Sequence, residues 1–324
     1  MRKPESMGTA VAEAPRVKRI TQTGDMVARL VVLVFAAAVL LICVLLAYEL
    51  WIGSAASRQK FGWSFLSSSL WNPVTEEFGA LPFLYGTIVT SVVALLISVP
   101  LGVGAAIFLS ELAPAGASNA LTFLVELLAA IPSVIYGLLG IFLLVPLMRS
   151  YGEPALKRGL GFLPFFQGPA YGVGFLTAGL ILAIMTFPFI ISVSRESLLA
   201  VPREQREAAL ALGATRWEMT WQVVVPYARL GIYGSIFLGL ARALGETMAV
   251  TMVIGNDPSV HASLFAPGYS IAAVIANEFT EATGSVYPAA LVELGLVLFC
   301  LTIVINGLAR LLIVATTSKA SRRS

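Results

Sequence analysis

The stretch RESLLAVPREQREAALALGATRWEMTWQVVVP, residues 195–226, is charged and helix-prone and lies between two long apolar segments. Pro202 can start a helix, because a proline in the first turn loses no hydrogen bond. Gly213 can end that helix, because glycine accepts the left-handed conformation of a helix stop. Thr215 and Glu218 have the spacing of a capping box, which starts a second helix. The stretch therefore predicts a helix–turn–helix elbow.

The composition around this elbow is that of a membrane protein. Of the 324 residues, 58% are hydrophobic and only 12% are charged, a balance typical of integral membrane chains. Six apolar segments reach or exceed the ~20 residues that cross a bilayer. The first is too long for the core of a signal peptide. The sequence predicts an all-α polytopic membrane protein with six transmembrane helices, at Val27–Ile52, Phe83–Leu109, Ala120–Leu147, Gly172–Val193, Gly231–Ile254 and Pro288–Val314.

The distribution of lysine and arginine predicts the orientation of the chain. Fifteen of these residues lie in the N-terminal tail with Arg29, the elbow and the C-terminal end, and five lie in the alternate loops. Because positive charge concentrates on the cytoplasmic side, we expect both termini and the elbow in the cytoplasm. The expected organisation is a basic tail (1–26), a first helix with an external loop (27–82), a core of membrane helices (83–314) containing the elbow in the cytoplasmic loop 195–230, and a C-terminal tail (315–324).

The residue inventory excludes several classes of function. Cys43 and Cys300 both lie in apolar segments, so a disulfide framework is not expected. His261 is the single histidine, which excludes a multi-histidine metal site, and no serine–histidine cluster lies at membrane depth. The chain contains no GxxxxGK[ST] motif, so it lacks the usual loop that holds nucleotide phosphates. Any ATP must therefore be handled by a partner.

Two external segments carry features beyond simple connection. Residues 53–82 include Trp63, Phe65 and Trp71, which are suited to an aromatic belt at the level of the lipid headgroups. Ser270 is a possible N-cap for the apolar segment Ile271–Glu278, which is too short to span a bilayer. It predicts a re-entrant or interfacial helix. Membrane anchoring and docking of a partner both remain open for these segments.

Of the charged residues within the apolar segments, Glu126, Arg242, Glu246 and Glu293 are the informative ones. A charge at the bilayer centre costs about 2.5–3.5 kcal/mol even on a lenient scale, so such residues generally have partners and a purpose. Arg242 and Glu246 are four residues apart and are expected on one helix face. They predict either an ion pair that ties helices together or a pathway site where a guanidinium meets an oxyanion. Glu126 and Glu293 are further candidates.

The elbow resembles the cytoplasmic coupling motif of ABC-importer permeases. The matching positions are Glu207, Ala208, Ala209, Gly213, Val223, Val225 and Pro226. The family has isoleucine and leucine where this chain has the two valines, a conservative departure. In the family this elbow docks into a groove of a separate ATP-hydrolysing subunit, so the resemblance implies an ATPase contact. On charge alone, the alternative is an ordinary solvated loop.

Other stretches are similar to the permeases of bacterial phosphate ABC importers: FGALPFLYGTIVTS (78–91), AIPSVIYGLLG (130–140) and GLARALGETMAVTMVIGN (239–256). The resemblance covers about residue 62 to the last helix. It implies a type I ABC-importer permease core in the bacterial inner membrane, importing inorganic phosphate by alternating access. The implied partners are a PstA-like second permease, a PstB-like ATPase dimer that holds ATP and Mg²⁺, a PstS-like extracytoplasmic phosphate-binding protein and membrane lipid, with no nucleic acid. This chain would hold no cofactor and catalyse no bond cleavage.

Two alternatives remain open at this stage. The nearer is an ABC permease for another oxyanion, such as sulfate, molybdate or phosphonate. The farther is a secondary transporter that works without an ATPase and uses Arg242 and Glu246 for ion coupling. Transport in vesicles that lack any ATPase subunit would favour the second.

Overall fold

A computed structural model describes the backbone of residues 22–321 and the side chains of residues 25–311. The predicted N-terminal tail therefore lies outside the described residues except for its last few positions. The chain divides into two compact units, Met1–Glu49 and Leu50–Ser324. Helix α1 (Gln22–Gly53) ends just inside the second unit, and most of its described apolar side chains, from Met26 to Ile52, are exposed, as expected for a helix in lipid.

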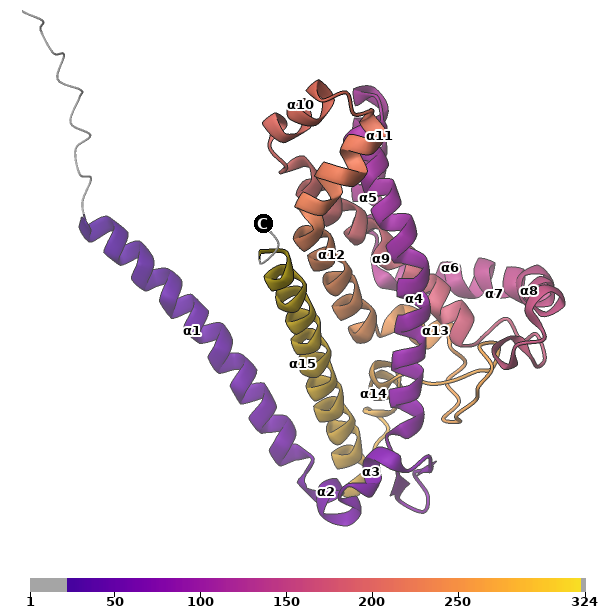
Figure 1. Ribbon diagram of the computed structural model, residues 1–324. Coiled ribbons are helices and arrows are strands. Elements are labelled where there is room, and N and C mark those ends of the chain that lie inside the picture. Colours follow the sequence, from indigo (N-terminus) through magenta and orange to yellow (C-terminus); the bar gives the residue numbers. More distant parts are fainter. Residues whose placement is uncertain (1–21, 322–324) are drawn as a thin grey trace, which may run out of the picture. The chain divides into compact units, whose positions relative to one another are not determined.

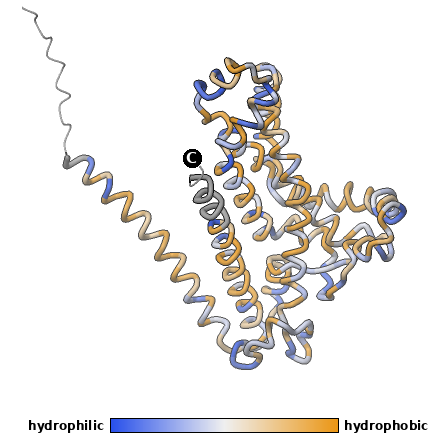
Figure 2. The backbone as a smooth tube through the Cα atoms, viewed as in Figure 1, coloured by the Kyte–Doolittle hydropathy of each residue, from blue (hydrophilic) through white to orange (hydrophobic). Residues whose placement is uncertain are grey.

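The prediction of six membrane-spanning helices is confirmed for the described residues. Six helices are long and apolar enough to cross a membrane: Asp25–Gly53, Leu81–Leu112, Ser133–Leu160, Phe175–Leu199, Arg216–Gly245 and Val286–Leu311. Within the second unit, polar residues gather at the elbow and at the opposite end, and the helices between them are hydrophobic (Figure 2). The chain is therefore a multi-pass membrane protein of the predicted all-α class.

The second unit contains fourteen further α-helices, one β-hairpin and five short π or 3-10 turns among the described residues (Figure 1). The helices are α2 (Ala55–Phe61), α3 (Ser64–Ser67), α4 (Leu81–Ile107), α5 (Ala115–Ala130), α6 (Ser133–Leu139), α7 (Val145–Leu147), α8 (Glu153–Leu160), α9 (Phe175–Leu199), α10 (Arg203–Ala211), α11 (Arg216–Met219), α12 (Val225–Gly245), α13 (Met248–Val253), α14 (Ile271–Glu278) and α15 (Val286–Ser321). The remaining elements are β1 (Trp71–Asn72), β2 (Glu77–Phe78), η1 (Phe108–Leu112), η2 (Gly140–Leu144), η3 (Met148–Gly152), η4 (Pro164–Phe166) and η5 (Thr220–Val224).

Helix α9 is the centre of the second unit, because α4 and α12 both pack along it. In its most apolar window 67% of the residues are buried. The central core contains Phe175, Ile181 and Met185 of α9 together with Val250 and Val253 of α13. Helices α6 to α8 run crosswise to α4 in this view (Figure 1). Helix α9 is apolar on all sides, as expected for a helix that is enclosed by its neighbours.

Each of the four π turns ends two residues before a proline. The turns η1, η2, η3 and η5 precede Pro114, Pro146, Pro154 and Pro226. In each case the residue just before the proline donates its N–H to the carbonyl five residues back, as Val225 does to Thr220. Because a proline lacks the N–H of a regular helix and crowds the preceding turn, the widened turn at η2, η3 and η5 lets the helix continue past it. At η1 the backbone is instead extended at Ala113, with ψ 140°, and the helix ends there.

Two of the predicted membrane segments have different bounds in the structure. The segment Ala120–Leu147 is broken at Ile131, where the backbone is extended with ψ 128°, because the residue before a proline is disfavoured in the helical region. Its first half is α5, a separate helix of 16 residues. The segment Gly231–Ile254 begins earlier, at Arg216, since η5 carries the helix past Pro226. Pro226 therefore lies within a helix that continues from the elbow into the membrane segment.

The last helix is longer than its apolar segment. We expected it to end at Val314 and to be followed by a C-terminal tail, but the backbone of α15 is helical through Ser321. The final residues, 322–324, lie outside the described residues. The predicted tail is thus mostly a continuation of the helix.

At the end of the second unit opposite the elbow, an aromatic cluster holds the β-hairpin against α14 and α15. The hairpin pairs Trp71 with Phe78 in antiparallel register. The indole N–H of Trp71 donates to Glu278 Oε2 at 2.8 Å, and the Tyr287 hydroxyl donates to the same oxygen at 2.7 Å. Of the predicted belt, Phe65 is buried and only Trp63 points outward, with 88% of it exposed. Phe65 and Trp71 of the predicted belt therefore pack within the protein and not at the lipid headgroups.

Helix α14 confirms the short helix predicted after Ser270. The hydroxyl of Ser270 accepts the backbone N–H of Ala273 at 3.3 Å. Four consecutive residues, Ile271 to Val274, are buried. The helix packs against α4, α13 and α15, so it is part of the protein core.

Candidate functional site

The elbow has the local structure that its sequence predicts. Helix α10 begins after Pro202, which is extended, with ψ 142°. Gly213 ends the helix with φ +87°, in the left-handed region that favours glycine. Thr215 accepts the N–H of Glu218 at 3.3 Å, and the N–H of Thr215 donates to the Glu218 carboxylate at 2.8 Å. The predicted capping box is therefore confirmed, and it starts α11.

The residues of the coupling motif divide between two faces of the elbow. Glu207 and Ala208 are exposed, whereas Ala209 is half-buried and packs on the core beneath the elbow. Leu212, one turn after Ala208, is 89% exposed. A Cβ added at Gly213 would meet no atom within 4 Å. The motif therefore presents an outward surface with a bare apolar side chain and an unobstructed glycine.

A local core joins the elbow to the membrane helices. It brings together the ends of α4 and α9, the turn η5 and the start of α12. Its buried members are Ala106, Ile107, Leu198, Val201, Met219, Val224, Ala228 and Ile232. No residue of α10 itself is fully buried. The first helix of the elbow therefore lies over this core.

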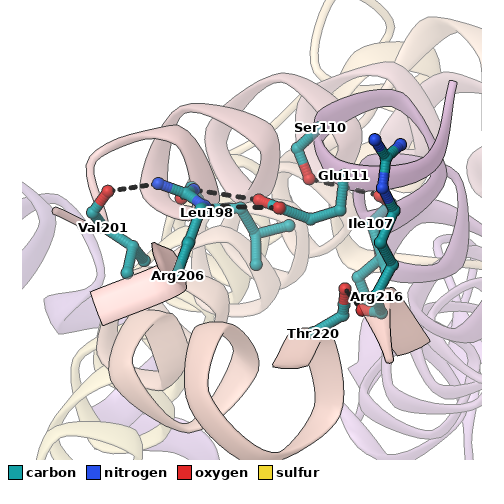
Figure 3. Close-up of polar contacts among 8 residues, drawn as sticks. All are labelled: Ile107, Ser110, Glu111, Leu198, Val201, Arg206, Arg216 and Thr220. Atoms are coloured by element: carbon teal, nitrogen blue, oxygen red, sulfur yellow. Dashed lines mark hydrogen bonds and ion pairs between the residues drawn. The ribbon is translucent and has the colours of Figure 1, made fainter. Parts of the chain in front are cut away.

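An ion pair fastens α10 to the end of α4 (Figure 3). Arg206 Nη2 lies 2.9 Å from Glu111 Oε1, and its Nε donates to Oε2 at 3.3 Å. The same guanidinium donates to the backbone carbonyls of Leu198, at 2.8 Å, and of Val201. The side chains are 17% and 5% exposed. The sequence reasoning missed Glu111, although a carboxylate at the end of an apolar segment was a signal to look for a basic partner.

The structure corrects the predicted geometry of Arg242 and Glu246. Helix α12 ends at Gly245, and Glu246 is extended with ψ 128°, so the two residues do not share a helix face. They form no ion pair in the described part of the chain. The Glu246 carboxylate instead accepts the N–H of Ala249, at 3.4 Å, near the start of α13. The prediction from the four-residue spacing was wrong because it required an unbroken helix from Arg242 to Glu246.

Arg242 lies against an aromatic ring. Its guanidinium carbon is 4.1 Å from the centre of the Phe189 ring of α9. Its Nε is buried and has no hydrogen-bond partner among the described residues. A ring face attracts a cation but supplies no acceptor, so this donor could serve an anion.

The other charged candidates lie in different surroundings. Glu126 is exposed on α5. Glu293 of α15 is 6% exposed, and its Oε2 has no hydrogen-bond partner in the described range. It lines an apolar cavity of about 590 Å³ together with Arg58. Within residues 25–311, no three His, Cys, Asp or Glu side chains gather where they could hold a metal ion.

Six spanning helices that carry an outward elbow with an alanine–alanine–glycine motif define the membrane component of a binding-protein-dependent transporter. Residues 98–316 match the family of binding-protein-dependent transport system inner membrane components, and the chain belongs to that family. The match includes the whole elbow and the break between α12 and α13.

Among curated proteins, the chain is similar to those called phosphate transport system permease protein PstC. It is 50% identical over 281 residues to the protein of Mesorhizobium japonicum, covering 85% of this chain and 86% of the relative. It is 49% identical over 283 residues to that of Haemophilus influenzae, covering 86% and 90%. A probable PstC of Methanocaldococcus jannaschii is 37% identical over 254 residues, covering 76% and 80%.

Solved structures show the same fold. A chain of the bacterial alginate ABC transporter, in complex with its alginate pentasaccharide-bound periplasmic protein, superposes with a TM-score of 0.57. It is 18% identical and the match covers 88% of this chain and 94% of that chain. The predicted ABC-importer permease core is therefore confirmed at the level of the fold.

Proposed function

We propose that this chain is a transmembrane permease subunit of an ATP-driven importer of inorganic phosphate. The observation that carries the proposal is the elbow, an exposed coupling motif fastened to the ends of membrane helices, in a chain half identical to PstC proteins. Coupling to a separate ATPase requires an exposed element that is firmly attached to the membrane helices. The partners would be a second permease, two ATPase subunits that bind ATP and Mg²⁺, and an extracytoplasmic phosphate-binding protein.

The elbow would be the contact with the ATPase. Ala208 and Leu212 form its apolar outward surface, with the exposed carboxylate of Glu207 beside them. Burial of the exposed Leu212 side chain against a partner would remove apolar surface from water and stabilise the contact. Gly213 would allow the partner backbone to come close, because nothing surrounds the position of its missing Cβ. This contact requires the elbow in the cytoplasm, as the charge distribution predicts.

Arg242 would lie on the substrate pathway. A cation at membrane depth without an ion-pair partner is costly, and a phosphate oxyanion is the ligand that a guanidinium suits best. The Phe189 ring would hold the guanidinium between substrates by a cation–π contact. Glu246, which we expected to neutralise Arg242, does not contact it in this state. It would act only in a conformation where α12 and α13 have moved.

The transport cycle would be alternating access. Closing of the ATPase dimer on ATP would move the docked elbow, and the helices would open the pathway outward; hydrolysis would reverse that bias. The π turns before the prolines support this mechanism, since they are places where a helix departs from regular geometry.

Reconstitution with all partner subunits in liposomes tests the proposal. We expect uptake of labelled phosphate that requires both internal ATP and the external binding protein. Sulfate, molybdate and phosphonate, offered separately with binding proteins of their own specificity, should give neither uptake nor stimulated ATP hydrolysis. Equal transport of another oxyanion would favour the alternative substrate. Uptake by this chain without any ATPase subunit would favour a secondary transporter.

A further inference from the structure

Arg206 connects three elements at the end of the membrane helices where the elbow lies. It belongs to α10, it donates to the carbonyl of Leu198 in the last turn of α9 and to that of Val201 just after the helix, and it forms a two-pronged ion pair with Glu111 of η1 (Figure 3). Both charged ends are largely removed from solvent, at 17% and 5% exposed. A planar guanidinium paired on two edges fixes orientation as well as distance.

Helix α10 has few other attachments to the membrane helices. None of its residues is fully buried, and Ala209 is its member that packs on the elbow core. A methyl group against an apolar surface resists separation but not sliding, because hydrophobic contact is non-directional. In the described part of the chain, the ion pair is therefore the directional side-chain link between α10 and α4.

The other end of the link is a π turn. Glu111 lies in η1, where Ala113 donates its N–H to the carbonyl of Phe108 at 2.8 Å. This turn continues α4 directly, and α4 runs along α9 for most of its length. A displacement of Glu111 is thus applied to the end of a long, packed helix. Packed helices transmit such displacements because interiors are dense and poorly compressible.

We propose that the Arg206–Glu111 pair is the joint through which movement of the elbow is transmitted to α4. Both are positioning residues: neither would touch phosphate or nucleotide. Without the pair, the ATPase could still bind the outward surface of α10, but the helix would shift over its core without moving α4. The proposal rests on the proposed function and deepens it, by naming the connection between the ATPase contact and a membrane helix.

The pair can be broken with little change in shape. Glu111→Gln keeps the size of the side chain but removes its charge and puts an amide NH2, which accepts no hydrogen bond, in place of one of the two oxygens that Arg206 contacts. The two-pronged pair is therefore lost, and we expect the complex to assemble normally. Phosphate taken up per ATP hydrolysed should fall about tenfold, within the usual range for coupling between sites. Arg206→Gln should lower this ratio at least as much, because it also removes the hydrogen bonds to the carbonyls of Leu198 and Val201. The double variant should be no worse than Arg206→Gln alone, because the Glu111 change removes an interaction that the Arg206 change has already removed.

A covalent link separates a mechanical joint from general destabilisation. In a background with Cys43→Ser and Cys300→Ser, Glu111→Cys with Arg206→Cys removes the pair and offers two thiols. We expect a short bismaleimide linker to restore most of the phosphate-to-ATP ratio, whereas a monofunctional maleimide should not. Failure of the linked protein to recover, in a complex that still assembles, would overturn the proposal.

The exposed Lys60–Glu76 pair gives a matched control. It is 3.3 Å long, its side chains are 41% and 46% exposed, and it lies far along the chain from the elbow. Glu76→Gln should leave the phosphate-to-ATP ratio unchanged. An unaltered ratio in Glu111→Gln would contradict the joint while leaving the proposed function intact. Absence of ATP-driven phosphate uptake by the unmodified complex would instead contradict the proposed function itself.

Discussion

The elbow and the break between α12 and α13 both carry functional candidates, and only the elbow has the local geometry that its sequence predicts. At the elbow, the end of α10 at Gly213 and the capping box that starts α11 each depend on residues within three or four positions of one another. At the break, the expected pairing of Arg242 with Glu246 required a helix that continues through Gly245, and the helix ends there. The difference teaches that capping chemistry is decided locally, whereas the continuity of a membrane helix depends on its neighbours.

The largest expected effect is at the break. Arg242→Gln should reduce ATP-driven phosphate uptake to background, because it removes the positive charge that we place on the substrate pathway. Phe189→Leu should retain most uptake, since it removes the ring and leaves the charge. Assembly is checked by co-purification with the second permease. If Arg242→Gln fails to insert or assemble, Arg242 has a structural role. The break between α12 and α13 would then carry no evidence for a substrate pathway.

The next effect is at the glycine stop. Gly213→Asp should leave the protein in the membrane but uncouple ATP hydrolysis from uptake, because it adds bulk and charge to the outward surface. Gly213→Asn adds similar bulk and, like aspartate, tolerates the left-handed region. Gly213→Ala adds one methyl group but strains the backbone by about 1–2 kcal/mol. We expect the two larger residues to uncouple more than alanine. The reverse order would mean that backbone strain, not docking, explains the glycine.

Ala208 and Ala209 test whether the exposed face and the core-facing side of the elbow have different roles. Ala208→Leu should weaken binding of the ATPase and leave the fold of the permease unchanged, because Ala208 is exposed. Ala209→Leu should instead destabilise the elbow, since overpacking a filled core costs about 1–3 kcal/mol. Hydrogen exchange of α10 reports the second effect and ATPase affinity reports the first. Identical behaviour of the two variants would show that the faces are not distinct.

The smallest expected effect concerns the capping box. Thr215→Ala removes the hydroxyl that accepts from Glu218 and should cost about 1 kcal/mol at the start of α11. Thr215→Ser keeps the acceptor and should be nearly silent. Faster amide exchange at residues 216–219 in the alanine variant alone would confirm the cap. Equal exchange in both variants would indicate that packing on the elbow core holds this helix start.

Much of this protein could be predicted because a bilayer imposes simple requirements on a sequence. The six spans, the short helix after Ser270 and the elbow follow from hydropathy and from caps that satisfy backbone groups within a few residues. The same reasoning placed two span boundaries wrongly. Hydropathy does not register the extended backbone at Ile131 or the π turn that carries the chain past Pro226.

The sequence by itself determined the membrane class, the number of spans and the local structure of the elbow, because each depends on the composition or chemistry of short stretches. Only the tertiary structure decided which charges meet. Arg206 and Glu111 are separated by 95 positions in the chain, whereas Arg242 and Glu246 are separated by four and do not pair. Ion pairs depend on distances in space, and these are set by how α4, α9 and α12 pack.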